Sequence, residues 1–91
     1  MSWGTEVERE RRNRIRLAVY AYAYEFMNES LIPDGEYDQL SREINPSIST
    51  GNKKMDKFFR EKFEPDTGMW IRSHPEILRI NQIYREHFRS K

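Results

Sequence analysis

The sequence predicts an all-α fold: one small domain of about four helices, in which a long first helix precedes a short second one. Apolar residues recur at helical spacing along most of the 91-residue chain, and no stretch of useful length shows the alternation of a β-strand. Turn-forming residues divide the chain into segments of helix length. Two Trp, five Tyr and five Phe residues supply much of the apolar area that so short a domain needs for its core.

The first helix is predicted at residues 5–28. Thr5 followed by Glu8 fits a capping box, and Glu10 lies four residues before Arg14, the favourable order for an ion pair on a helix. Residues 17–27 are apolar almost all round, so we expect this half to be enclosed by the rest of the fold. The preceding half is charged all round, so we expect it to project into solvent or to reach a partner.

The second helix is predicted at residues 34–44 and the third at residues 52–63. Asp34 is the candidate N-cap of the second helix, whose first turn is otherwise acidic. A loop rich in Pro, Ser and Gly separates the two helices. The third helix carries apolar residues at helical spacing, which predicts a buried stripe; these are Met55, Phe58, Phe59 and Phe63.

The fourth helix is predicted at residues 73–89. Ser73 is its candidate cap, Pro75 suits the first helical position, and Glu76 completes a capping box. From the four helices we expect a core that includes Leu17, Tyr20, Phe26, Leu40, Phe59, Trp70, Ile80 and Tyr84.

The composition excludes several classes of protein. Sixteen basic and 15 acidic residues give a net charge of +1, and their interspersion argues against a dedicated polyanion binder. Cysteine is absent, which rules out disulfides and thiolate metal sites. The two histidines, His74 and His87, have no partner at metal-ligand spacing, so no metal site is expected. No signal-like or membrane-spanning run is found, and we expect a cytoplasmic protein.

The functional signal lies in YAYEFMNESLIPDGEYDQL, residues 22–40. Its spacing of tyrosines and acidic residues resembles the small N-terminal helical domain, called Ia, of NAD-dependent DNA ligases. That domain carries a Tyr-x-Tyr-His element and, about eight residues later, an element close to Ile-Pro-Asp-x-Glu-Tyr-Asp-x-Leu. Tyr24, Asp34, Tyr37 and Asp38 match this pattern by position, and the family's histidine corresponds to Glu25.

The resemblance implies that the protein binds the nicotinamide mononucleotide (NMN) half of NAD through Tyr24, Glu25, Asp34, Tyr37 and Asp38. In the family, the aromatic side chains stack on the nicotinamide ring and the carboxylates hydrogen-bond the amide and the ribose. The residue types suit this role, because flat rings need aromatic faces and diols need carboxylates that accept two hydrogen bonds. At the histidine position, however, an ionised glutamate repels a phosphate to which a histidine can donate.

An alternative interpretation of the same residues needs no ligand: they serve the structure alone, or persist as a signature of the fold after ligand binding was lost. Asp34 then caps the second helix, Asp38 lies in its solvated first turn, and Tyr24 and Tyr37 pack on each other as core residues. In either case we expect a protein that is not an enzyme. The ligases adenylate a lysine within a Lys-x-Asp-Gly motif of a separate domain, and this sequence contains no such motif.

A second class of function uses the first helix. Arg9, Arg12 and Arg16 share one helical face, and a basic patch of this kind predicts contact with a partner. The chain as a whole also resembles small proteins of phages and prophages. The alternative function is therefore an interaction protein that contacts a host protein or, less favoured because glutamates interleave the arginines, nucleic acid.

Overall fold

The computed structural model of the protein describes residues 6–65 and 67–88, which form one compact unit of helices without a β-strand. The predicted all-α fold class is thereby confirmed. The elements in order are α1 (Glu6–Met27), α2 (Asp34–Glu43), α3 (Lys53–Glu61), the short 3-10 helix η1 (Met69–Ser73), α4 (Ile77–Ile83) and a π-helical turn, η2 (Tyr84–Phe88). None of the described helices is long and apolar enough to cross a membrane.

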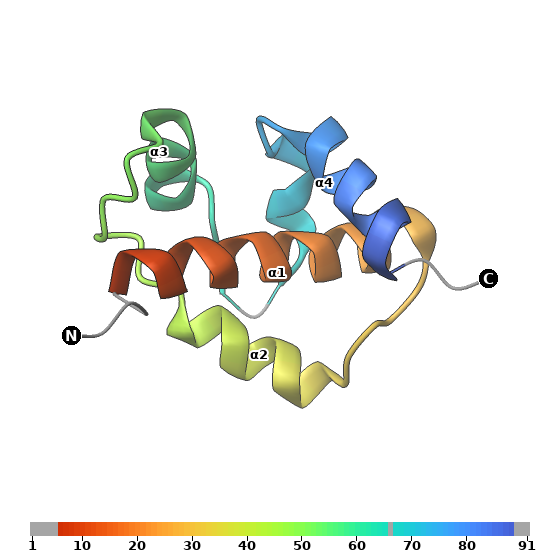
Figure 1. Ribbon diagram of the computed structural model, residues 1–91. Coiled ribbons are helices and arrows are strands. Elements are labelled where there is room, and N and C mark those ends of the chain that lie inside the picture. Colours follow the sequence, from red (N-terminus) through yellow and green to blue (C-terminus); the bar gives the residue numbers. More distant parts are fainter. Residues whose placement is uncertain (1–5, 66, 89–91) are drawn as a thin grey trace.

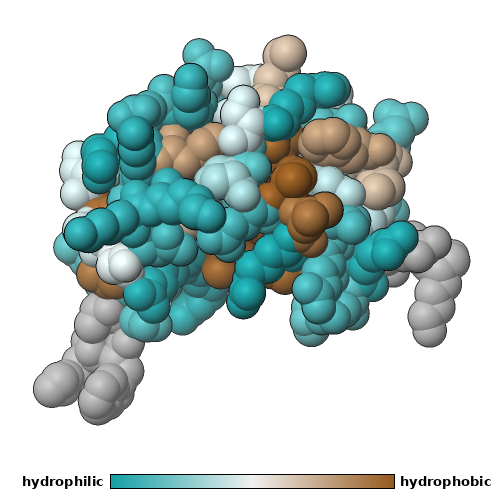
Figure 2. Space-filling model, turned by 90° about the horizontal axis from the view of Figure 1, so that it is seen from above, coloured by the Kyte–Doolittle hydropathy of each residue, from teal (hydrophilic) through white to brown (hydrophobic). Residues whose placement is uncertain are grey.

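The long helix α1 is the central element of the molecule. It packs against α2 on one side and against η1, α4 and η2 on the other, so that α2 lies below it and α3 and α4 above it in Figure 1. Seen from the side of α3 and α4, the surface is largely hydrophilic around a small hydrophobic spot (Figure 2). Because α1 is covered from both sides, all seven residues from 17 to 23 are buried.

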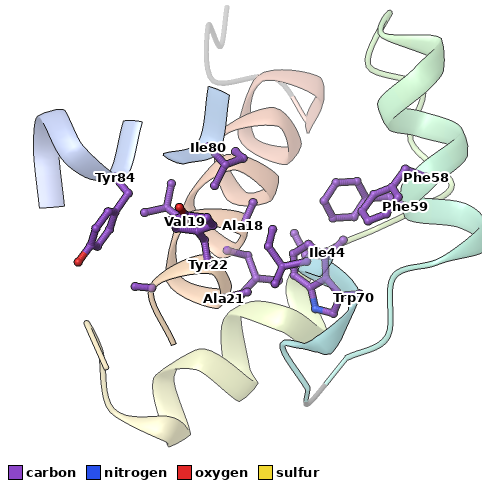
Figure 3. Close-up of a cluster of buried hydrophobic side chains, with 13 residues drawn as sticks. Ala18, Val19, Ala21, Tyr22, Ile44, Phe58, Phe59, Trp70, Ile80 and Tyr84 are labelled. Atoms are coloured by element: carbon purple, nitrogen blue, oxygen red, sulfur yellow. The ribbon is translucent and has the colours of Figure 1, made fainter. Parts of the chain in front are cut away.

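The core gathers along this buried stretch of α1 (Figure 3). Phe58 and Phe59 reach it from α3 and pack on the indole of Trp70, with ring centroids 6.1 and 5.6 Å away. Tyr22 reaches the opposite end, where its ring lies 5.8 Å from that of Tyr84. Tilted and edge-on ring pairs of this kind add to the stability that burial alone gives.

Most of the predicted core is confirmed. The buried members are Leu17, Tyr20, Phe59, Trp70, Ile80 and Tyr84, and Leu40 is partly buried against them. Phe26 was predicted in the core and is 44% exposed, because the cover over α1 ends at Ala23. The ring of Phe26 instead stacks on Tyr22 at 5.0 Å and lies beneath the guanidinium of Arg72.

The first half of α1 is exposed on one face only, although the whole of it was expected to project into solvent or to reach a partner. Glu10, Asn13 and Arg14 are buried, because the loop between α2 and α3 covers this side of the helix. The predicted pair of Glu10 with Arg14 forms at 2.6 Å and is itself buried.

Arg14 holds this loop in place. Its Nη1 donates to Asp56 of α3 at 2.8 Å, and its Nη2 donates to the carbonyls of Asn45 and Ile48 at 3.1 and 3.2 Å. The Glu10 carboxylate accepts from the backbone N–H of Asn45 at 3.0 Å. Because each buried charge has hydrogen-bonding partners, the network is tolerated in the interior.

The predicted starts of the second and fourth helices are both corrected, that of the second as follows. Asp34 is the first helical residue of α2 rather than its N-cap, which is Pro33 in an extended conformation. The carbonyl of Pro33 accepts the backbone N–H groups of Glu36 and Tyr37, so the backbone makes the first turn without a side-chain cap. The predicted cap at Thr5 lies outside the described residues.

The fourth helix begins at Ile77, not at Ser73, so the predicted capping box is wrong. Ser73 instead ends η1, a 3-10 turn that brings Trp70 and Ile71 into the core. The imidazole Nδ1 of His74 accepts from the backbone N–H of Glu76 at 3.0 Å, which is the kind of bond expected from a serine cap. α4 then continues as the π-helical turn η2.

Candidate functional site

A hollow of about 470 Å³ opens between the second half of α1 and the start of α2. Its size falls within the range of small-molecule sites. Its lining comes from four segments of the chain: Tyr20, Ala21, Tyr24 and Glu25; Ser30, Leu31 and Ile32; Asp34, Tyr37 and Asp38; and Thr67, Gly68 and Met69. All five residues that the sequence assigned to a nicotinamide site are among them.

The turn between α1 and α2 sets the shape of the hollow. Asn28 ends α1 in the left-handed region, at a φ of 53°, which asparagine tolerates better than most residues. The backbone N–H of Glu29 then donates to the carbonyl of Ala23 at 2.9 Å, and the Glu29 carboxylate accepts from the hydroxyl of Tyr84. The chain is thereby turned back so that α2 faces α1.

Asp34 and Asp38 lie four residues apart on α2 and therefore on one face of the helix. Both residues line the hollow. Like charges at this spacing cost a helix a few tenths of a kcal/mol, although the first-turn position of Asp34 offsets part of this through the helix dipole. A pair of acids held at some local cost is consistent with a binding role.

Tyr37 forms the inner wall of the hollow. Its hydroxyl donates to the carbonyl of Thr67 at 2.9 Å, and the indole N–H of Trp70 donates to the same oxygen at 2.7 Å. Burial is the main reason that the pKa of Tyr37 is raised to about 12, with the charges of Glu25 and Asp38 contributing. Tyr37 therefore presents the hollow with a neutral ring whose hydroxyl is already engaged.

Glu25, at the position of the family's histidine, is half-buried in the wall. Its carboxylate pairs with Arg72 of η1 at 3.2 Å, while the guanidinium of Arg72 also lies 5.5 Å from the ring centroid of Phe26. Sequence analysis missed this pair, because Glu25 and Arg72 are far apart in the chain and no local pattern connects them.

The floor of the hollow was also missed. It comes from residues 67–69, where the loop after α3 leads into the first residue of η1. A Cβ at Gly68 would lie 3.5 Å from the Cβ of Ala21 and 3.6 Å from both Glu25 and Tyr37, so the glycine lets this segment approach the two helices closely. The only available signal was Gly68 itself, which indicated a turn but not the element against which the turn packs.

The hollow is acidic. Glu25, Asp34 and Asp38 contribute three carboxylates, and none of the described lining residues is Lys, Arg or His. Tyr24 supplies an aromatic ring at the rim and is 59% exposed. This combination of carboxylates and an accessible aromatic face can hold a flat group that carries hydroxyl donors or a positive charge.

The structure contradicts two parts of the interpretation that needs no ligand. Asp34 does not cap α2, and the exposure of Tyr24 shows that it is not a core residue. Asp38 is half-buried rather than fully solvated.

The remaining predicted residues lie elsewhere. Arg9, Arg12 and Arg16 are exposed on α1 and do not line the hollow. His74 is buried, with its ring 5.2 Å from that of Phe58, and His87 is exposed beside Glu86. Within the described part of the chain, no cluster of His, Asp and Glu could hold a metal ion.

The fold and the site together define a small all-α domain with an acid-lined hollow between its first two helices. No family model, no curated protein and no solved structure matches this chain.

Proposed function

We propose that the protein is a non-catalytic module that binds a nicotinamide nucleotide, NMN or NAD, in the hollow between α1 and α2. One observation carries the proposal. The five residues that the ligase resemblance assigns to the ligand come from two different helices, and all of them line one hollow of about 470 Å³. A motif that served only to shape the two helices would not require its polar members to converge on an open cavity.

Each residue has a role that fits its surroundings. The exposed ring of Tyr24 offers a face for the nicotinamide ring. Asp34 and Asp38 accept hydrogen bonds from the ribose hydroxyls or the carboxamide. Tyr37, held by Thr67, fixes the inner wall against which the ligand packs.

A titration of isotope-labelled protein with NMN and then NAD, followed through backbone amide shifts, tests the proposal. We expect saturable shifts at residues 24–25, 34–38 and 67–69. Tyr24→Ala and Asp38→Asn should weaken binding, because they remove the ring face and one acceptor. Glu36→Gln is the matched control, since Glu36 is exposed on the same turn of α2 and does not line the hollow. Absence of shifts at millimolar ligand would exclude the function.

The second candidate function is a partner contact through Arg9, Arg12 and Arg16. The observation that favours it is a division among the arginines of α1. Arg11 is exposed but donates to the carbonyl of Thr50, and Arg14 is buried in its network. Arg9, Arg12 and Arg16 are also exposed, and of these Arg16 donates to the hydroxyl of Tyr20. Charge reversal at Arg9 and Arg12 should abolish capture of a phage-host partner and leave the nicotinamide titration unchanged.

A further inference from the structure

We infer that the hollow recognises a positive charge and disfavours a phosphate, so that its preferred ligand is a cationic nucleoside such as nicotinamide riboside rather than NMN or NAD. This inference rests on the proposed function and narrows it to one chemical class. The oxidised nicotinamide ring is a cation when it is joined to ribose, and NMN differs from the riboside only by its phosphate.

The charges around the hollow favour a cation. Three acidic residues line it, and two arginines outside the lining are engaged with lining residues: Arg72 is paired with Glu25, and Arg16 donates to the hydroxyl of Tyr20. A phosphate that took Arg72 away from Glu25 would leave that carboxylate unpaired in the wall. A cationic ring between Tyr24 and the carboxylates meets the negative face of an aromatic ring and opposite charges at once.

The start of α2 gives little compensation for a phosphate. The N-terminus of a helix attracts anions through its free N–H groups and its dipole. Here Asp34, which lines the hollow, already occupies the first turn, so its charge opposes the approach of a second anion.

Two of the hydroxyl donors that line the hollow are already engaged. The hydroxyl of Tyr37 donates to Thr67, and the hydroxyl of Ser30 donates to the carbonyl of Ile32 at 2.9 Å. A phosphate needs several donors, whereas a ribose diol needs acceptors. The lining therefore matches the nucleoside part of the ligand and not its phosphate.

Isothermal titration of the full chain with three ligands tests this inference. Nicotinamide riboside carries the cationic ring, its reduced dihydro form has nearly the same shape without the charge, and NMN adds the phosphate. We expect the oxidised riboside to bind about tenfold more tightly than either of the other two, a difference that falls as salt is added.

Two variants and a control locate the effect. Glu25→Gln should weaken binding of the oxidised riboside several-fold and leave the reduced riboside nearly unchanged, because only the oxidised ring is positively charged. Asp38→Asn should weaken binding of both ribosides, and of the oxidised one more, because it removes a charge together with a hydrogen-bond acceptor. Glu36→Gln, outside the lining, should change neither. Circular dichroism verifies that each variant is folded, and the comparison of ligands on the unaltered protein stands without any variant.

The outcomes separate the inference from the proposed function. Tighter binding of NMN than of the riboside would overturn the inference and leave nicotinamide binding in place. Equal affinity for the oxidised and reduced ribosides would also overturn it, because the positive charge of the oxidised ring would then contribute nothing to binding. If none of the three ligands binds, the proposed function fails and the inference fails with it.

Discussion

Arg14 is the side chain on which most of the polar interior depends. It is buried, and it bridges two carboxylates that belong to different helices, Glu10 of α1 and Asp56 of α3. Burial alone would raise the pKa of Asp56, but hydrogen bonds from Thr50 and Arg14 outweigh it and lower that pKa. The carboxylate of Asp56 therefore stays ionised near neutral pH, and its pair with Arg14 is a fixed structural element.

Replacing Arg14 with Met should lower the free energy of unfolding by about 3–5 kcal/mol, because two buried carboxylates lose their shared cation. Urea unfolding measures the loss. Arg12→Met, at an exposed position of the same helix, should change the stability by less than about 0.5 kcal/mol. Similar losses in the two variants would show that Arg14 contributes no more than an exposed arginine.

His74 makes stability depend on pH. Burial lowers the pKa of His74 from 6.5 to about 4, so between these values the unfolded chain binds a proton that the folded chain does not. Its stabilising contribution is complete above pH 6.5 and is lost as the pH falls toward 4. We expect the unfolding free energy to drop by about 2 kcal/mol between pH 7 and pH 5.

Urea midpoints measured at both pH values test this dependence. His74→Asn should flatten it, whereas His87→Asn, at an exposed residue, should leave it unchanged. A dependence that survives in His74→Asn would assign it to another group.

At the residue scale, the sequence predicted apolar positions better than charged ones. The core residues Leu17 and Phe59 follow from helical spacing. The burial of Glu10 and Arg14 does not, because a charged stretch looks the same whether solvent or a distant loop covers it. Glu10 and Arg14 are buried because residues 45–50, which are distant in the sequence, pack over them.

Among the elements, α4 shows why helix ends are harder to predict than helices. The helix ends that were predicted within the described residues were placed to within two residues, except at the start of α4, where a 3-10 turn and a histidine bond replace the expected cap. Local patterns specify that a helix forms, whereas its first turn depends on tertiary partners.

Two glycines, one in α2 and one in the loop after it, should respond oppositely to substitution by Ala. Gly35 lies in the first turn of α2 with nothing within 4 Å of an added Cβ, whereas Gly51 has a φ of +89° and an added Cβ would lie 3.3 Å from Arg11. Gly35→Ala should stabilise the protein by about 0.4–1 kcal/mol, and Gly51→Ala should destabilise it by about 1–3 kcal/mol. Thermal unfolding checks both, and the same sign for the two variants would contradict the backbone assignment.

For the molecule as a whole, the central place of α1 has a clear energetic meaning. Leu17 is fully buried at the level where α1 is covered from both sides, whereas Leu78 of α4 is 80% exposed. Leu17→Ala should cost about 2–5 kcal/mol and Leu78→Ala almost nothing. Guanidinium unfolding of the two variants measures this contrast, which equal losses would disprove.

The sequence predicted the part of the hollow that α1 and α2 form, but not the part that the distant segment contributes. Residues on α1 and α2 lie close in the sequence, so a local motif identified Tyr24, Glu25 and the three residues of α2. Thr67, Gly68, Met69 and the partner Arg72 arrive from the far half of the chain. No pattern within residues 22–40 indicates which distant segment closes the space beside them.

The carbonyl of Thr67 accepts from both Tyr37, in the wall of the hollow, and Trp70, in the core. The indole of Trp70 is thus linked, through this carbonyl, to the lining of the hollow, although only 4% of the residue is exposed. Its fluorescence should therefore act as a built-in reporter. In a Trp3→Phe background, which leaves Trp70 as the sole indole, an emission shift on ligand addition would give an optical assay that requires no label.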